Sequence, residues 1–372
     1  MTNLFQYITI LIILIIFFLL SILEQYISIS LKKIIVFILL LLISLLASKR
    51  TIGTDTSNYE LIFHYSPIIN DFQYFLNNLF EYRIEPLFVL IISYLKQFGI
   101  SVEGLFFISS YISLGLVSIL AFKVSKKHQI LIIYILCLFY LIRGPLDIIR
   151  QFLAMSFFLV ALYYLSDNKI IKYYIVILIG ITAHSSLIVA LFLPLIVKKN
   201  WSVREYILTL ISMYGLGIIL INVLRILINN LETDLFFLDN LELYLNTTYY
   251  YDSLSHFMMR LIMEHFLPIL GILLVVFSLS KKVFFYTDNF SKVLLNTMII
   301  GSLFYSFFMG TGQSTLAIRL NYLLQIGNII IIKNIISDLY FKDKLEPFII
   351  FTFLGFIFNF IVVYYYSGVY RF

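Results

Sequence analysis

Long runs of apolar residues recur along almost all of this 372-residue chain, and few charged residues interrupt them. A helix needs about 20 mainly apolar residues to cross roughly 30 Å of hydrocarbon. Runs that reach or approach this length lie near 4–22, 34–48, 104–122, 129–143, 148–165, 203–228, 261–279, 293–309, 317–336 and 347–367. The pattern predicts an all-α, polytopic transmembrane helix bundle with about 10–12 spanning helices.

Two further apolar segments are ambiguous. Residues 86–97 are short for a span, whereas residues 172–197 are long for one and are interrupted by His184 near the middle. The longer segment fits either one tilted helix or two half-helices that form a hairpin. The number of crossings depends on how these two segments run.

The composition leaves little room for a soluble catalytic domain. Hydrophobic residues make up 62% of the chain and charged residues only 12%, about half the share that is typical of a soluble domain. The chain has no internal repeat and no low-complexity linker, so we predict a single integral membrane domain over residues 1–372. The first apolar run lacks a basic leading region and a small-residue cleavage site, and is expected to be a retained helix.

No metal, cofactor or nucleic-acid site is expected. Cys137 is the single cysteine and lies in an apolar run, and no Cys/His cluster, Asp-x-Asp motif or Walker loop occurs. The net charge of +6 is interpreted as a sign of membrane topology, because basic residues flank the spans of membrane proteins.

Lysines and arginines separate along the predicted path. If 86–97 does not cross and 172–197 returns to its starting side, most lysines share one face with Arg204, and the positive-inside bias makes that face cytoplasmic. The polar segments 49–85 and 229–256 then form extracytoplasmic loops. The remaining arginines fall at or near the same outer face: Arg50, Arg83, Arg143, Arg150, Arg225, Arg260, Arg319 and Arg371. A different path for 86–97 would remove this separation.

Arginine has a geometry that suits phosphate, because its planar fork of donors matches phosphate oxygens two at a time. We therefore interpret five outer arginines as a site for a pyrophosphate at the membrane surface: Arg50, Arg143, Arg150, Arg260 and Arg319. The alternative is that each arginine pairs with a nearby carboxylate or extends from a helix end toward water. Arg150 and Arg319 each lie within apolar helical sequence. Charged residues in such surroundings usually mark a functional site, which favours a polar cavity.

The segment Arg50-Thr-Ile-Gly53-Thr-Asp55-Thr-Ser-Asn-Tyr59 follows directly on a helix end. Gly53 permits a tight turn. Asp55 is expected either to act as a general base toward a sugar hydroxyl or to cap a short helix over 56–59. Tyr59 is expected either to stack on a sugar ring or to lie in the interfacial aromatic belt.

A second segment runs from Arg143 through Asp147 and Arg150 to Ala154 and is predicted to start a helix, with Pro145 in its first turn. Asp147 there suits the helix dipole, and Arg150 and Ala154 share one helix face. The alternative is a surface pair between Asp147 and Arg150.

His184 lies among small residues within apolar sequence. It is expected either to be a hydrogen-bonded packing residue or, in a half-helix hairpin, to reach the outer cavity. The pair Glu264-His265 is a weaker candidate for a functional group.

These residues together resemble the EpsG-type family of bacterial polysaccharide polymerases, which is related to the O-antigen (Wzy-like) polymerases. The matching pattern is Arg-x-x-Gly-x-Asp-x-x-x-Tyr from Arg50 to Tyr59, followed by Arg-Gln-x-x-Ala at Arg150, Gln151 and Ala154. His184 and then Arg-x-x-Tyr at Arg319 and Tyr322 complete the set, which covers about 50–330 in the expected order.

The resemblance implies a membrane glycosyltransferase that moves a growing glycan from undecaprenyl pyrophosphate onto a lipid-linked repeat unit. It implies catalytic roles for Asp55, His184 and Arg150, and substrate binding by Arg50, Gly53, Tyr59, Gln151, Arg319 and Tyr322. Arg143 and Arg260 are expected to bind substrate as members of the outer arginine cluster. The expected partners are the lipid-linked oligosaccharide and membrane lipids, and a chain-length regulator is left open. The expected location is the bacterial inner membrane, with the active face extracytoplasmic.

Other functions place arginine in a polar membrane cavity too. A lipid-linked oligosaccharide flippase needs charge on both faces and along a central path, often in repeated halves, whereas these groups cluster at one face. An O-antigen ligase would use the same donor with a lipid A core acceptor, so residues alone discriminate poorly. An acyltransferase would require a membrane histidine such as His184.

Overall fold

The computed structural model describes residues 3–50, 53, 55–68, 85–197, 199–230, 254–281, 288–340 and 346–368. Within these ranges all regular structure is helical and no strand occurs, which confirms the all-α prediction. Six described helices are long and apolar enough to cross a membrane, or seven if the successive helices α15 and α16 form one broken span. The predicted 10–12 crossings are reached only when shorter apolar helices of 10–17 residues are counted as well. The chain is a multi-pass membrane protein.

The described chain divides into two compact units, and each is treated by itself. Unit 1 comprises Met1–Pro194 and Ile329–Phe372, and unit 2 comprises Leu195–Asn328. The predicted single membrane domain stays a prediction. The second predicted outer loop lies largely outside the described residues, as does 69–84 within the first.

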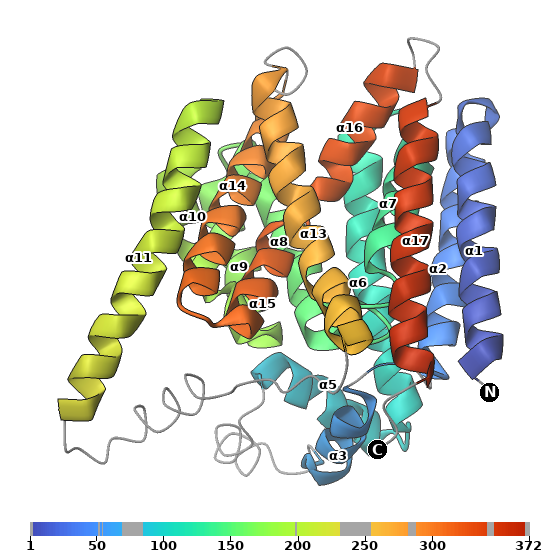
Figure 1. Cartoon of the computed structure of the whole chain (residues 1–372). Helices are drawn as coiled ribbons and strands as arrows, with labels where there is room; N and C mark the ends of the chain where they lie inside the picture. Colours follow the sequence, from blue (N-terminus) through green and yellow to red (C-terminus); the bar gives the residue numbers. More distant parts are fainter. Residues whose placement is uncertain are drawn as a thin grey trace. The chain divides into compact units, whose positions relative to one another are not determined.

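Unit 1 contains most of the helices, drawn in Figure 1. They are α1 (Asn3–Leu23), α2 (Ile29–Ser48), α3 (Thr56–Tyr65), α5 (Pro86–Gln97), α6 (Val102–Val124), α7 (Gln129–Tyr140), α8 (Ile149–Ser166), α9 (Ile170–Ala183), the 3-10 helix η2 (Ser185–Phe192), α10 (Leu193–Ile196), α16 (Asn328–Tyr340) and α17 (Glu346–Gly368), the last residues of α10 and the first of α16 belonging to unit 2. Every residue of α7 is buried, because α1, α2, α6 and α17 pack around it. The side chain of Asn359 on α17 donates to the backbone carbonyl of Leu138, so a buried hydrogen bond links α17 to α7.

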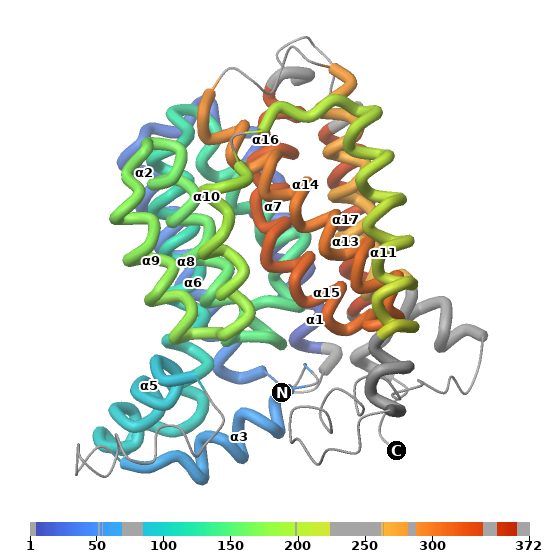
Figure 2. The backbone as a smooth tube through the Cα atoms, turned by 90° about the vertical axis from the view of Figure 1, so that its left-hand side faces the viewer, coloured from blue at the N-terminus to red at the C-terminus, as the bar shows by residue number. Residues whose placement is uncertain are grey.

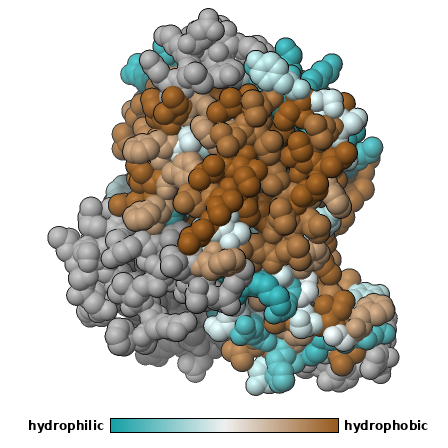
Figure 3. Space-filling model, turned by 90° about the vertical axis from the view of Figure 1, so that its right-hand side faces the viewer, coloured by the Kyte–Doolittle hydropathy of each residue, from teal (hydrophilic) through white to brown (hydrophobic). Residues whose placement is uncertain are grey.

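The outward sides of α1 and α2 are apolar and exposed, for example at Leu19, Ile34 and Phe37. Exposed apolar helix faces of this kind suit contact with lipid. A helix satisfies its own backbone hydrogen bonds, so none is left unpaired in hydrocarbon. Figure 3 shows one such apolar surface, with hydrophilic side chains gathered at its ends.

The two ambiguous segments of the sequence are settled in unit 1. Figures 1 and 2 place α5 beside α3 at one end of the helices of unit 1, where it packs against the first turns of α6 and against α9, so 86–97 does not run along the full length of the long helices. The segment 172–197 is a hairpin that turns at His184. The hydroxyl of Tyr173 donates to the carbonyl of Ala190, and that of Tyr174 to Leu191 at 3.4 Å, so η2 returns along α9.

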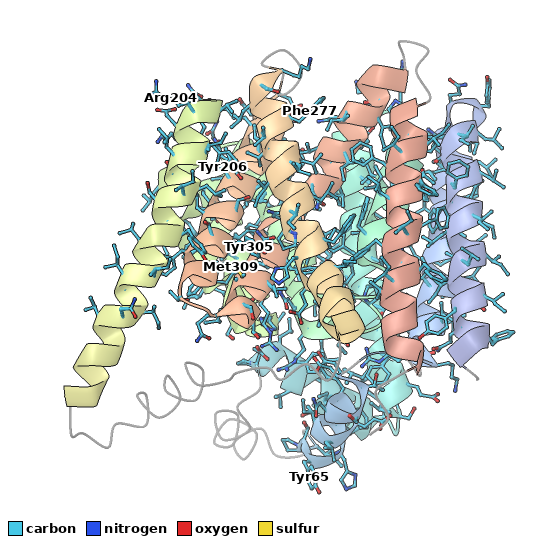
Figure 4. All side chains as sticks on the ribbon, in the orientation of Figure 1. Tyr65, Arg204, Tyr206, Phe277, Tyr305 and Met309 are labelled. Carbon is cyan, nitrogen blue, oxygen red and sulfur yellow. The ribbon has the colours of Figure 1, made fainter. Side chains whose placement is uncertain are left out.

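Unit 2 contains α11 (Val203–Asn230), α13 (Leu254–Ser280), α14 (Asn289–Gly310) and α15 (Ser314–Leu324). Helix α14 packs against the other three. The Nδ1 of His265 on α13 lies 2.5 Å from the hydroxyl of Tyr305 on α14, and Figure 4 labels this tyrosine. His265 therefore joins two helices of unit 2.

Candidate functional site

Two sequence motifs about ninety residues apart meet at one end of unit 1. The backbone N–H of Asp55 donates to Oδ1 of Asp147 at 3.4 Å. Gly53 has a φ of +117°, and a Cβ there would lie 2.6 Å from the carbonyl oxygen of Leu146. Only glycine tolerates both that backbone conformation and that approach. The tight turn predicted at Gly53 is present, and it lets the first motif lie directly on the second.

The start of the second motif differs from the prediction. Pro145 and Asp147 were predicted in the first turn of a helix, but α8 begins at Ile149. The preceding residues form a tight turn instead, in which Ile148 N–H donates to the carbonyl of Arg143 at 3.1 Å. Asp147 is buried and accepts from the backbone N–H of Asp55, so the alternative of a pair with Arg150 at the surface does not hold for Asp147.

Arg50 follows α2 and is only 5% exposed. Its Cζ lies 3.7 Å from the ring centroid of Phe106 and 5.2 Å from that of Tyr59, and Nη1 donates to the carbonyl of Asp147 at 3.4 Å. Its Nε and Nη2 are buried without a hydrogen-bond partner among the described residues. Burial lowers the pKa of Arg50 to about 10, so the guanidinium stays charged at neutral pH. Unsatisfied buried donors on a cation are costly, and an anion would satisfy them.

Arg150, in the first turn of α8, has a carboxylate partner from another part of the chain. Its Nη1 lies 2.6 Å from Oε2 of Glu85, the residue before α5. It also hydrogen-bonds with the phenol of Tyr59, and its Cζ lies 5.6 Å from the ring centroid of Tyr59 and 5.9 Å from that of Phe88. Two guanidinium groups therefore lie against one tyrosine.

Tyr59 is held by an apolar cluster in which α3, α5, α6 and the start of α8 meet. Its ring lies 5.7 Å from Phe88 and 6.3 Å from Phe106, centroid to centroid. Burial raises the pKa of its phenol, so the hydroxyl is neutral and can both donate and accept. The side chain of Tyr59 is only 2% exposed, so in this structure its ring neither lies in an interfacial aromatic belt nor has an open face for a sugar, and its role in binding a glycan stays a prediction.

Glu85 is the site residue that the sequence did not reveal. Besides Arg150, its Oε1 accepts from the backbone N–H of Ser185 at 3.3 Å, at the turn after His184. Although burial opposes ionisation, the charge of Arg150 holds the pKa of Glu85 below its ordinary value. Glu85 therefore links α8 with the α9–η2 turn. Its only sequence signal is an acidic residue directly before a helix-starting proline.

His184 ends α9 with an extended backbone and caps η2. Its Nδ1 accepts from the backbone N–H of Ser186 at 3.2 Å and lies 2.8 Å from the hydroxyl oxygen of that residue. Because Nδ1 accepts, the proton of the neutral imidazole lies on Nε2. The half-buried ring therefore lies at the hairpin turn rather than within a continuous helix.

Asp55 occupies the N-cap position of α3, yet its side chain makes no capping hydrogen bond. Helix α3 extends beyond the predicted 56–59 to Tyr65. Capping is therefore not what the Asp55 carboxylate does here. It contributes negative charge close to Arg50.

The other predicted site residues are placed as follows. Arg143 lies in the turn before α8, and Gln151 is buried in α8 next to Arg150. Unit 2 holds the remainder: Arg319 is exposed on α15 and Tyr322 is buried there, while Arg260 belongs to α13 with its side chain outside the described set. Their participation in the cluster of unit 1 stays a prediction.

The arrangement combines fixed cations, an aromatic wall and groups that exchange protons. Guanidinium groups such as those of Arg50 and Arg150 can bind a polyanion, and carboxylates and imidazoles such as those of Asp55, Glu85 and His184 can exchange protons. Among the described residues, no group of three or more His, Cys, Asp or Glu side chains could hold a metal ion.

Comparison with protein families gives one match, which covers nearly the whole chain. The model of the EpsG family matches residues 32–372. No curated protein and no solved structure matches the chain.

Proposed function

Because the chain belongs to the EpsG family, we propose that it is a bacterial surface-polysaccharide polymerase, of the kind that makes O-antigen, capsule or exopolysaccharide. In this proposal it transfers a growing glycan from undecaprenyl pyrophosphate onto the sugar end of a lipid-linked repeat unit. The family is associated with polymerase-type glycosyl transfer. The observation that supports the proposal best is the pair of guanidinium groups, Arg50 and Arg150, against the buried ring of Tyr59.

The leaving group of this reaction is a lipid pyrophosphate, on which negative charge develops as the glycosidic bond breaks. Fixed donors aimed at developing charge lower the barrier, because they need no reorganisation in the transition state. Arg50 supplies two buried donors without partners among the described residues, and Arg150 supplies a fork already held by Glu85. A pyrophosphate would satisfy the donors of Arg50 and compete with Glu85 for Arg150.

The attacking sugar hydroxyl must lose its proton. Asp55 is the proposed acceptor, because its carboxylate is not used as a helix cap. His184 is proposed as a hydrogen-bond donor to a substrate oxygen. Its Nδ1 accepts from Ser186, so in the neutral ring the proton lies on Nε2. Gly53, Arg143, Gln151 and the unit 2 residues Arg260, Arg319 and Tyr322 are proposed to bind the glycan or its pyrophosphate.

We place this site on the extracytoplasmic face of the inner membrane. Arg50 contacts Phe106 near the start of α6, whereas Lys126 and Lys127 follow the end of the same helix. By the positive-inside bias the lysine end is cytoplasmic, so the arginine end faces outward.

Complementation of a strain that lacks its polymerase tests the proposal. The wild-type chain should restore a ladder of glycan lengths on a gel, and Arg50→Ala should lose it while Arg204→Ala, at an exposed arginine of α11, keeps it. Single repeat units on the surface without the protein indicate a polymerase. A complete absence of surface glycan would indicate a flippase or ligase, and would overturn the proposal.

A further inference from the structure

A cavity of about 360 Å³ opens in unit 1 at the end opposite the arginines. Polar residues of two connections line it: Glu24 and Lys32, around the turn between α1 and α2, and Lys126, Lys127 and His128, between α6 and α7. The site of the proposed glycosyl transfer uses none of them. The cavity is therefore a separate feature, at the face where the lysines collect.

The deepest charges in this cavity already satisfy each other. The carboxylate of Glu24 accepts from the backbone N–H groups of Ile130 at 2.8 Å and Leu131 at 3.1 Å, at the start of α7. It also lies 3.3 Å from Nζ of Lys32, and both side chains are almost fully buried. Glu24 therefore pairs with Lys32 and also accepts from the N-terminal end of α7.

The remaining charge at the cavity is positive. Lys126 and Lys127 are exposed at its rim, and among the described residues that line it Glu24 is the one carboxylate. The pKa of His128 is lowered to about 4, by burial first and then by the lysines Lys333, Lys32 and Lys127. His128 is therefore neutral at physiological pH and experiences the excess of positive charge around it.

The cavity also has an apolar part of its lining, which includes Ile29, Ile336 and Phe348 together with other aliphatic side chains. It adjoins exposed apolar side chains on α1 and α2, such as Leu23 and Leu31. A free phosphate ion gains nothing from an apolar wall. A phospholipid does, because its acyl chains start next to its phosphate.

From these observations we propose that the cavity binds the phosphate headgroup of an anionic phospholipid of the cytoplasmic leaflet, with Lys126 and Lys127 as its cationic contacts. Basic pockets between helices on the cytoplasmic side suit such headgroups. The acyl chains extend along α1 and α2 from the apolar wall.

Native mass spectrometry of the purified full-length protein tests this, with phosphatidylglycerol or phosphatidylcholine added in detergent. We expect retained phosphatidylglycerol, weak retention of phosphatidylcholine, and a loss of at least about tenfold in phosphatidylglycerol retention for the double variant Lys126→Gln/Lys127→Gln. The control is Lys33→Gln/Lys172→Gln, which changes the same net charge at exposed lysines outside the cavity. It should retain the lipid at the wild-type level.

Three outcomes would overturn the proposal: equal loss in both double variants, equal retention of both lipids, or displacement of the lipid by inorganic phosphate at matched concentration. The last outcome would indicate a soluble-anion site instead. If the Lys126/Lys127 double variant does not fold, the single charge reversal Lys126→Glu at an exposed position gives the same test, and undiminished phosphatidylglycerol retention would contradict the proposal.

Discussion

Arg150 and Glu85, 65 positions apart in the sequence, form an ion pair in which Nη1 of the arginine lies 2.6 Å from Oε2 of the glutamate. The pair is largely shielded from water, and Glu85 also accepts from Ser185 at the turn of the α9–η2 hairpin. One carboxylate therefore determines where the guanidinium and the imidazole-bearing turn lie relative to each other.

Glu85→Gln should lower the free energy of unfolding at neutral pH by about 1–2 kcal/mol. Breaking an exposed ion pair costs less than this and breaking a fully buried one costs more, and the pair of Arg150 and Glu85 is partly buried. Because the pKa of Glu85 is lower in the folded chain than its ordinary 4.5, the unfolded chain binds more protons below that pH. Wild-type stability should therefore fall as the pH drops below about 4.5, and the gap to Glu85→Gln should close.

Melting temperatures of the purified protein in detergent, recorded from pH 7 to pH 3, provide this measurement. Glu103→Gln is the matched control, because Glu103 pairs with Lys49 while both side chains are exposed. It should change stability little. An equal effect of the two substitutions at pH 7 would show that the Arg150 pair contributes no more than a surface pair.

Arg150→Lys should lose much of the polymer, and Arg150→Ala nearly all of it. Lysine keeps the charge but lacks the planar fork that contacts Glu85 and Tyr59 together and would hold a pyrophosphate. The measurement is the glycan ladder, normalised to protein abundance in the membrane. Full ladders from Arg150→Ala at normal abundance would remove this residue from the mechanism.

Asp55→Asn should abolish polymerisation and leave abundance intact, because the side chain makes no capping bond whose loss would unfold α3. His184→Gln should reduce the ladder only in part, since Gln can accept from Ser186 as the imidazole does. Wild-type ladders from Asp55→Asn would show that the carboxylate takes no proton, and Glu85 would then be the next base to test.

Gly53→Ala should reduce abundance or activity strongly. The positive φ alone costs an alanine about 1–3 kcal/mol, and its Cβ would collide with the backbone of Leu146. Gly115→Ala in α6 is the control, because a Cβ there meets nothing within 4 Å and alanine favours helix. Immunoblots of membrane fractions and glycan ladders report the difference, and equal behaviour of the two variants would contradict the close approach.

Cysteines at Ser57 and Lys126 should report opposite faces of the membrane. Both positions are exposed, and the native Cys137 is buried and is replaced by alanine in the background. A membrane-impermeant thiol reagent should label Ser57→Cys but not Lys126→Cys in intact cells with a permeabilised outer membrane. Labelling of Lys126→Cys but not of Ser57→Cys would show that the topology is the reverse of the proposed one, with the arginine end on the cytoplasmic side.

The sequence by itself determined the class of the protein. Runs of apolar residues long enough to cross hydrocarbon admit only helices, because no water is present there to bond an unpaired backbone. The spacing of Arg50, Gly53, Asp55 and Tyr59, followed by Arg150 and Gln151, was sufficient to predict the family. Such signals are local: each depends on residues within one turn or one span.

Only the tertiary structure decided which of these residues meet. The pairing of Arg150 with Glu85 joins segments whose separation no local spacing encodes, and Asp147 became a partner of Asp55 instead of a helix-start residue because the turn before α8 folds back on Gly53. The sequence also did not decide whether the chain reverses direction at His184, because the same apolar composition suits one tilted helix or a hairpin. Hydrogen bonds from Tyr173 and Tyr174 to η2, which form only when the two halves pack together, selected the hairpin.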